Sequence, residues 1–205
     1  MFIRLGLLVA AIHVYFLWSL GAGFYYDSVI YAQLGQALLT EGGLQAFYSG
    51  PRYYVFQHLA PGLPLLWSGA FLVAGQYGWV LFAAVQHAVA GAALIYLLWV
   101  WRALLGAPFI FLAPILVSCN PQYESLHNRL MTESMTGSML MFGIAATSSL
   151  LLNRSKGTMP VVILSASAVV ASQVRTQSMV YFVIFILVVL LSRHERPIRS
   201  ATVLC

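Results

Sequence analysis

A few charged side chains at the edges of long apolar runs are the residues of this chain best suited to chemistry. Asp27, the only aspartate of the sequence, follows the first such run; Glu124 and Glu133 precede a later one, and Arg175 ends another. A positioned carboxylate can take the proton of a hydroxyl group that is itself a weak nucleophile. A charged arginine at the boundary of an apolar segment attracts an anionic partner. We therefore expect acid–base chemistry at Asp27, at the end of the first apolar segment.

These acidic residues also have a purely structural interpretation. Asp27 is a preferred N-cap residue for a helix over residues 28–39. Glu124 lies in the first turn of a helix that we expect to continue into the next apolar run, and the helix dipole favours an anion there. In such a continuous helix Glu133 lies four residues after Arg129, a spacing at which opposite charges pair. The sequence leaves both interpretations open.

The composition is that of an integral membrane protein. Of the 205 residues 61% are hydrophobic and 7% are charged, and the mean hydropathy is +0.87. Soluble domains carry about 25% charged residues. The net charge of +5 comes from basic residues scattered singly along apolar runs, so they form no basic face for nucleic acid. Cys119 and Cys205 lie far apart and have no metal-ligand spacing.

Six apolar runs are predicted to cross the membrane as helices. A spanning helix needs about 20 apolar residues. The runs cover residues 3–22, 79–101, 107–119, 135–152, 160–174 and 178–192. The first run is long for a signal peptide and rich in aromatic residues, so we interpret it as an uncleaved anchor. Residues 61–75 form a shorter apolar segment that fits a helix lying at the membrane surface.

The distribution of basic residues decides whether residues 61–75 cross. Cytoplasmic loops of membrane proteins collect Lys and Arg. With six spans and both termini in the cytoplasm, seven basic residues lie inside and three outside, namely Arg52, Arg129 and Arg175. A seventh crossing at residues 61–75 reverses this distribution. Arg175 opposes the trend, and either a protein partner or a lipid phosphate would attract it there.

The loop over residues 23–78 is therefore predicted to be extracytoplasmic and to hold two juxtamembrane helices. In the first, residues 28–39 place an apolar stripe on one face, formed by Ile30, Leu34, Ala37 and Leu38. The second begins near the proline-rich segment of residues 60–64. Gln86 and His87, inside the second span, are expected to make hydrogen bonds between helices. The predicted fold class is thus all-α integral membrane, in a single membrane domain over residues 1–205.

Four short motifs in order resemble the N-terminal part of integral membrane glycosyltransferases of the GT-C type, the protein O-mannosyltransferase and aminoarabinose-transferase-like group. The motifs are Phe24-Tyr25-Tyr26-Asp27 in the first loop, His58-Leu59-Ala60-Pro61-Gly62-Leu63-Pro64-Leu65-Leu66, Asn120-Pro121 with Met131-Thr132-Glu133, and Arg175 after the fifth span. The resemblance covers nearly the whole chain, which has about half the length of a typical member. Each motif alone is degenerate, and their order together with the topology carries the resemblance.

The resemblance implies transfer of a sugar from a polyprenyl-phosphate carrier to an acceptor outside the cytoplasm. Asp27 would be the general base, and Arg175 would bind the carrier phosphate. The remaining candidates are Arg129 and Arg52 for the phosphate, Glu133 and Glu124 near the acceptor or a metal, and His58 and Tyr26 without a defined role. No metal ligand or cofactor is assigned, although a divalent cation between Asp27 and Glu133 remains an option. The location implied is the bacterial inner membrane, with the active site on its outer side.

A second interpretation is a non-catalytic membrane subunit or truncated remnant of such an enzyme. It would bind the carrier lipid, or a membrane protein partner that supplies the missing helices. A small transporter fits less well, because the charged residues gather at the outer boundary and not at mid-membrane. Loss of transfer activity on replacement of Asp27 would favour the enzyme, and a co-purifying partner would favour the subunit.

Overall fold

The computed structural model describes residues 2–21, 26–40, 60–129, 132–152 and 158–202, and for residues 26–27 and 193–202 it describes the backbone alone. Every regular element in these ranges is helical. The elements are α1 (Phe2–Leu20), α2 (Tyr26–Thr40), α5 (Gly62–Ala74), η1 (Gly75–Tyr77), α6 (Gly78–Trp101), α7 (Ala107–Ser118), α8 (Pro121–Asn128), α9 (Thr132–Leu151), α10 (Met159–Val174), η2 (Thr176–Ser178) and α11 (Met179–Thr202).

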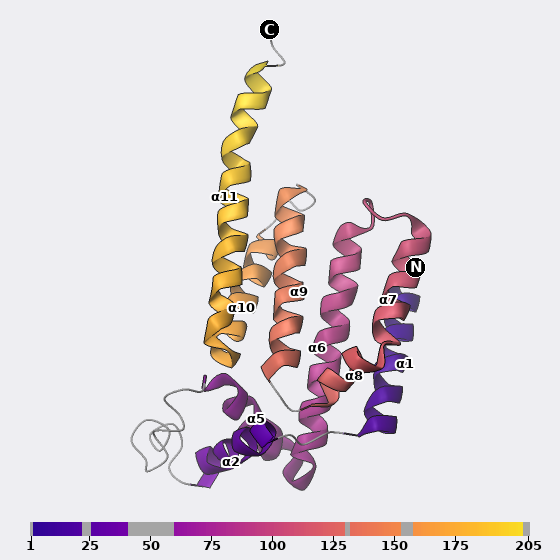
Figure 1. Cartoon of the computed structure of the whole chain (residues 1–205), viewed down its shortest axis with the longest axis vertical. Coiled ribbons are helices and arrows are strands. Elements are labelled where there is room, and N and C mark those ends of the chain that lie inside the picture. The colour runs from indigo at the N-terminus through magenta and orange to yellow at the C-terminus, as the bar shows by residue number, and fades with distance from the viewer. Residues whose placement is uncertain (1, 22–25, 41–59, 130–131, 153–157, 203–205) are drawn as a thin grey trace.

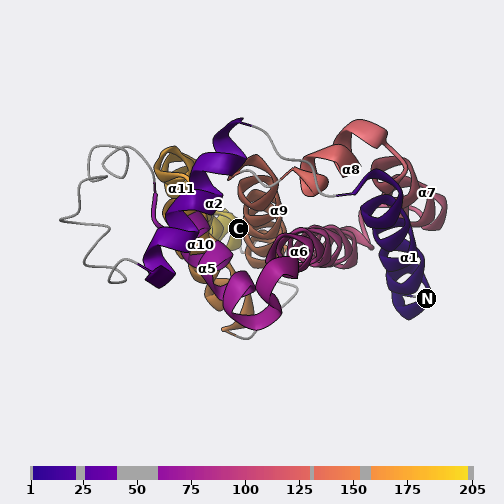
Figure 2. The ribbon, with the colours of Figure 1, turned by 90° about the horizontal axis from the view of Figure 1, so that it is seen from below.

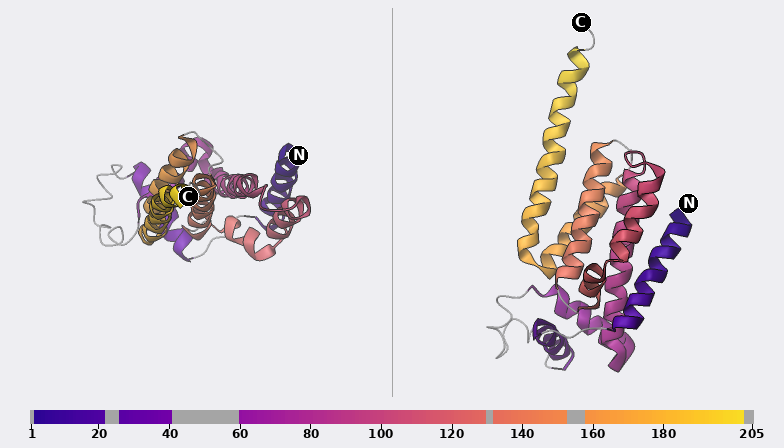
Figure 3. Two further views of the ribbon diagram at one scale, coloured as in Figure 1. Left: turned by 90° about the horizontal axis from the view of Figure 1, so that it is seen from above. Right: turned by 45° about the vertical axis from the view of Figure 1, so that its right-hand side comes forward.

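The long helices form a bundle, and α2 and α5 lie across one of its ends. α9 packs between α6 and α10, while α1 packs on the other side of α6 (Figure 1). Viewed along the bundle, α2 and α5 lie nearly in the plane of the picture (Figure 2). α11 extends beyond the other helices at the opposite end (Figure 3). The six apolar runs predicted as spans thus coincide with α1, α6, α7, α9, α10 and α11, to within a few residues except at the end of α11.

The exterior of the bundle is apolar, as expected for a membrane protein. Among the described residues, three segments are long and apolar enough to cross a membrane, Phe2–Leu20, Gly62–Trp101 and Thr132–Leu151. Shorter apolar helices are Ala107–Ser118, Met159–Val174 and Thr176–Ser192. Along α11, Val180, Val183, Ile184, Leu187 and Leu191 are all exposed. A contiguous apolar surface of this kind is rare on soluble monomers.

Two glycines allow the chain to turn sharply between α5 and α6. Gly75 has a φ of 54°, a left-handed conformation that glycine adopts at no steric cost. At Gly78 the backbone and ring of Phe71 come so close that a Cβ atom would lie 2.9 Å from them. The long apolar segment therefore consists of two helices, and α5 is directed across the end of the bundle while α6 runs along it.

α2 packs closely on α5, and a buried hydrogen bond joins the two helices. The Ser68 hydroxyl donates to the Gly35 carbonyl oxygen at 2.7 Å. Trp67 is fully buried and stacks on Phe71 and on Phe82, with ring centroids 5.3 Å apart in both pairs. Leu34, Ala37 and Leu38 of the predicted apolar stripe are buried, as expected.

The predicted continuous helix from the segment after Asn120 into the fourth span is wrong. α8 ends at Asn128, and Arg129 has an extended backbone with φ −79° and ψ 128°. His127 Nδ1 and Ser134 Oγ lie 2.6 Å apart. In one helix, residues seven apart are separated by about 10 Å along the axis, so the chain must change direction between them. Arg129 and Glu133 therefore do not form a pair on one helix.

A substitution at Gly62 tests the packing of α5 on the bundle end. A Cβ atom at this first residue of α5 would lie 2.5 Å from the carbonyl oxygen of Gln173 in α10. Because that atom belongs to the backbone, Gly62→Ala should destabilise the protein by about 1–3 kcal/mol, lowering its thermal midpoint in detergent by several degrees. Gly69→Ala in the same helix meets nothing within 4 Å and is the matched control. Equal midpoints for the two variants would contradict the close approach.

Candidate functional site

One polar group forms where α10 turns into α11, at the bundle end that α2 and α5 cover. Arg175 follows the last residue of α10 and has an extended backbone, with φ −150° and ψ 107°. Its side chain therefore does not continue the helical pattern of α10. Its Nη1 lies 3.2 Å from Glu133 Oε1, and its Nε donates to Gln177 Oε1 at 3.1 Å. About half of each charged side chain is exposed, 45% for Arg175 and 41% for Glu133. The pair is thus fixed in orientation and still accessible.

The N-terminal turn of α9 holds Glu133 in place. Thr132 Oγ1 donates to Glu133 Oε2 at 3.2 Å. The free N–H groups at a helix N-terminus favour a carboxylate nearby. Glu133 can therefore orient the guanidinium group of Arg175.

A second polar group is buried among α1, α6 and α8. His13 of α1 and His87 of α6 approach each other through their Nδ1 atoms, which are 2.9 Å apart. Glu124 Oε2 of α8 lies 3.2 Å from His13 Nδ1 and 3.4 Å from His87 Nδ1. Glu124 has no exposed surface, and both histidines are buried. These side chains, far apart in sequence, thus place three ligand atoms at the corners of a small triangle.

Hydrogen bonds around the triangle fix the orientation of His87. Its Nε2 lies 3.0 Å from Asn128 Oδ1, and Asn128 Nδ2 donates to the Phe16 carbonyl oxygen at 3.4 Å. Because the amide nitrogen faces a carbonyl, the amide oxygen must face His87. His87 Nε2 therefore carries a proton, and in the neutral ring the Nδ1 lone pair points to His13 and Glu124.

Two other side chains of α8, Tyr123 and His127, are uncharged at neutral pH. Burial raises the pKa of Tyr123 to about 12, and the nearby Glu124 adds to the effect. Burial, followed by the nearby His87, lowers the pKa of His127 to about 4. Burial also acts to raise the pKa of Glu124, but the hydrogen bonds and positive charge that His13 and His87 supply when their Nδ1 atoms carry protons outweigh it, so the pKa falls below its ordinary value. Glu124 is therefore a carboxylate at neutral pH, among neutral side chains of its own helix.

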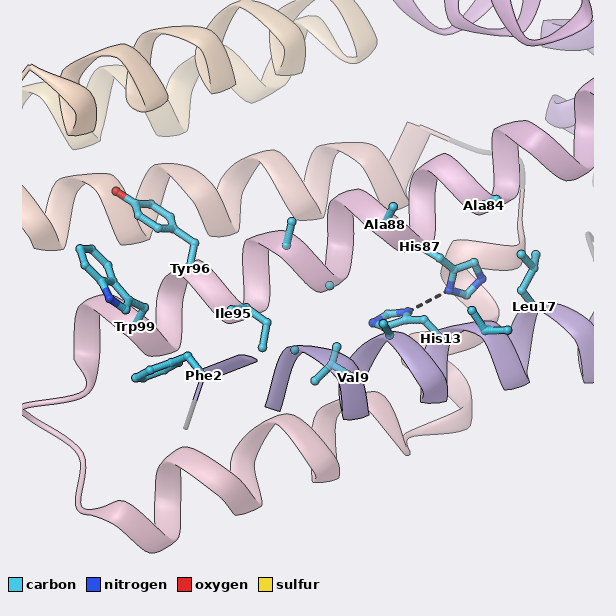
Figure 4. Close-up of a pocket in the computed structure, with 15 residues that line it drawn as sticks. Phe2, Val9, His13, Leu17, Ala84, His87, Ala88, Ile95, Tyr96 and Trp99 are labelled. Atoms are coloured by element: carbon cyan, nitrogen blue, oxygen red, sulfur yellow. Dashed lines mark hydrogen bonds between the residues drawn. The ribbon is translucent and has the colours of Figure 1, made fainter. Parts of the chain in front are cut away.

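His13 and His87 also line a groove between α1 and α6 with a volume of about 660 Å³. Its walls are almost entirely apolar (Figure 4). The groove runs from Leu17 and Ala84 beside the histidines to Phe2 and Trp99 at its other end. It gives a path from the apolar exterior to the two histidine rings.

The structure separates Glu124 from Glu133 and Arg175, although the sequence analysis placed all three in one site. Glu133 meets Arg175, whereas Glu124 turns inward to the histidines. Asp27 is the second residue of α2, inside its first turn and not at its N-cap, and Tyr26 is the first. The side chains of Tyr26 and Asp27, and the whole of Arg52 and His58, lie outside the described residues.

Two buried histidines, His13 and His127, were absent from the residues that the sequence analysis singled out. His13 lies inside a membrane-length segment, where an ionisable side chain is by itself a sign of function. His127 lies three residues after Glu124, the spacing that puts two side chains on one face of a helix. The predicted hydrogen bonding of His87 between helices is confirmed.

No protein-family model, curated protein or solved structure matches this chain.

Replacing Glu133 should leave the stability of the protein nearly unchanged. Exposed ion pairs contribute about 0–1 kcal/mol, and both partners here are about half exposed. Glu133→Gln should therefore shift the thermal midpoint in detergent by no more than about 4 °C. Thermal unfolding of the purified variant beside wild type measures this. A larger loss would mean that the pair supports the fold and does not merely orient Arg175.

Proposed function

We propose that this protein transfers a sugar from a polyprenyl-phosphate carrier to an acceptor on the outer side of the bacterial inner membrane. The observation that carries the proposal is the Arg175–Glu133 pair at the bundle end crossed by α2 and α5. Arg175 is accessible, oriented by two neighbours, and on the same end of the bundle as the first turn of α2. Asp27 belongs to that turn.

The topology proposed with this function has six spans and two juxtamembrane helices. α1, α6, α7, α9, α10 and α11 cross the bilayer, and α2 and α5 rest on its outer surface. The direction of α5 across the bundle end supports this arrangement. The basic residues of the short connections then lie mainly inside. Arg175 and Glu133 come to the outer membrane boundary, where a lipid phosphate group lies.

In the proposed reaction Asp27 acts as the general base. Its carboxylate takes the proton of the acceptor hydroxyl group while the hydroxyl oxygen forms a bond to the anomeric carbon of the sugar. The bond between that carbon and the phosphate oxygen breaks, and the carrier phosphate leaves with the bonding electrons. Arg175 donates to the phosphate oxygens as their negative charge grows, and Glu133 keeps the guanidinium group in position.

Substitutions at Asp27 and Arg175 should abolish transfer without unfolding the protein. Removal of a positioned base costs about 10²–10⁴-fold in rate, and removal of a donor to the leaving group about 10²–10³-fold. Asp27→Asn and Arg175→Gln are compared with wild type in proteoliposomes that contain polyprenyl-phosphate-linked sugars. Arg102→Gln is the matched control, because Arg102 is also an exposed arginine. It follows the C-terminal end of α6, far from α2 and α5, and stacks on Trp99.

Binding of the carrier separates the two roles. Native mass spectrometry with undecaprenyl phosphate should show binding to wild type, Asp27→Asn and Arg102→Gln, and weaker binding to Arg175→Gln. Full transfer activity in a folded Asp27→Asn variant would refute the proposed base. Carrier binding without transfer, together with a membrane protein that co-purifies and restores transfer, would select the non-catalytic subunit instead.

Labelling of single cysteines tests the six-span topology. Gln76 and Leu104 are both exposed, at opposite ends of α6. In a background with Cys119 and Cys205 replaced by serine, Gln76→Cys should react with a membrane-impermeant maleimide in intact cells. Leu104→Cys should react only after the membrane is opened. The reverse pattern would show that the outer boundary assigned to Arg175 is in fact cytoplasmic.

A further inference from the structure

We propose that His13, His87 and Glu124 form a binding site for a divalent transition-metal ion of the zinc type. This site lies apart from Arg175 and Glu133, and it does not depend on the proposed transfer reaction. Three observations carry it: the distances among the three ligand atoms, the burial of Glu124, and the hydrogen bond that orients His87.

The distances match the edges of a zinc coordination tetrahedron. Zinc binds histidine nitrogen at about 2.0–2.1 Å and carboxylate oxygen at about 2.0–2.2 Å. Two ligands of one tetrahedral ion at these distances are therefore about 3.3 Å apart. The three ligand atoms here, two Nδ1 and Oε2, are 2.9, 3.2 and 3.4 Å apart. One ion above the centre of this triangle would reach all three with little movement of the side chains.

The carboxylate of Glu124 supplies the second argument. It has no exposed surface, and its Oε2 faces the Nδ1 atoms of His13 and His87 at 3.2 and 3.4 Å. Buried charges in proteins are paired or coordinate metals. A cation held among these three atoms would bind Oε2 directly.

Asn128 prepares His87 as a ligand. Histidines that bind metals almost always donate their other ring N–H to a protein oxygen, which fixes the tautomer and the ring direction. His87 donates from Nε2 to Asn128 Oδ1 at 3.0 Å, so its Nδ1 lone pair faces the triangle. The same amide is anchored by the Phe16 carbonyl oxygen. These two contacts of Asn128 do not depend on an ion.

The ligand set indicates the kind of metal. Imidazole nitrogens suit zinc, copper, iron and nickel, whereas magnesium and calcium prefer oxygen ligands alone. Three protein ligands leave a fourth position for water or another small ligand, as in catalytic zinc sites. The groove between α1 and α6 reaches both histidines and provides the way in. The ion would also join α1, α6 and α8, which lie far apart in the sequence.

The test is the metal content and affinity of the full-length protein in detergent, purified with an affinity tag that contains no histidine. Wild type, incubated with micromolar Zn²⁺ and passed over a desalting column, should retain one zinc ion per chain by mass spectrometry of the metal. His13→Ala, His87→Ala and Glu124→Gln should lose it. Asn128→Ala should weaken the affinity about 10–100-fold in competition with a chromophoric chelator.

A histidine elsewhere in the chain provides the control. His194 belongs to the C-terminal part of α11, and His194→Ala should retain zinc as wild type does. Loss of zinc in this variant as well would mean that the metal is bound elsewhere or nonspecifically, and would overturn the proposal.

A measurement on wild type alone decides the question if the variants fail to fold. X-ray absorption of the zinc-loaded protein should show nitrogen and oxygen ligands at about 2.0–2.1 Å with the outer-shell signal of two imidazole rings. Wild type that retains no zinc, or a spectrum without imidazole, would refute the site. The proposed transferase can fail its own test without affecting this result, since zinc binding is measured in the absence of any sugar donor.

Discussion

The arrangement of polar side chains is governed by one constraint, the lack of water inside an apolar bundle. A polar group in that interior is stable only with a partner from the protein itself. His13, His87, Glu124 and Asn128 meet this condition only together, because no single helix carries enough of them. Their contacts fix the positions of α1, α6 and α8 relative to one another. Apolar contacts alone would permit many other positions of these helices.

The short helix α8 is the element that makes this convergence possible. Asn120 accepts a hydrogen bond from the Gln122 amide at 2.9 Å and so begins the helix, with proline at its first position. Glu124, His127 and Asn128 then lie within one turn and face the bundle interior. Since the chain turns after Asn128, α9 can start with its own polar residues directed to a different neighbour. α8 is thus a short polar helix between two apolar helices, α7 and α9.

Local sequence patterns predict the positions of most helices, but they do not predict which side chains contact each other. The apolar runs and the stripe of α2 predicted the helices closely, because length and periodicity are local properties. The turn after Asn128 was missed, because nothing in the local pattern breaks the helix there. The Arg175–Glu133 pair joins residues 42 apart, and the histidine group joins residues on three helices. Such contacts depend on how helices rotate and cross, which local patterns do not encode.

The first turn of α9 touches both polar groups through neighbouring residues. Glu133 contacts Arg175, and Ser134 contacts His127. Because Glu133 and Ser134 are consecutive residues, a movement of this helical turn would alter both contacts at once. If ligands bind at both places, any effect of one on the affinity of the other would be reciprocal. The first turn of α9 is thus the direct covalent connection between the two polar groups.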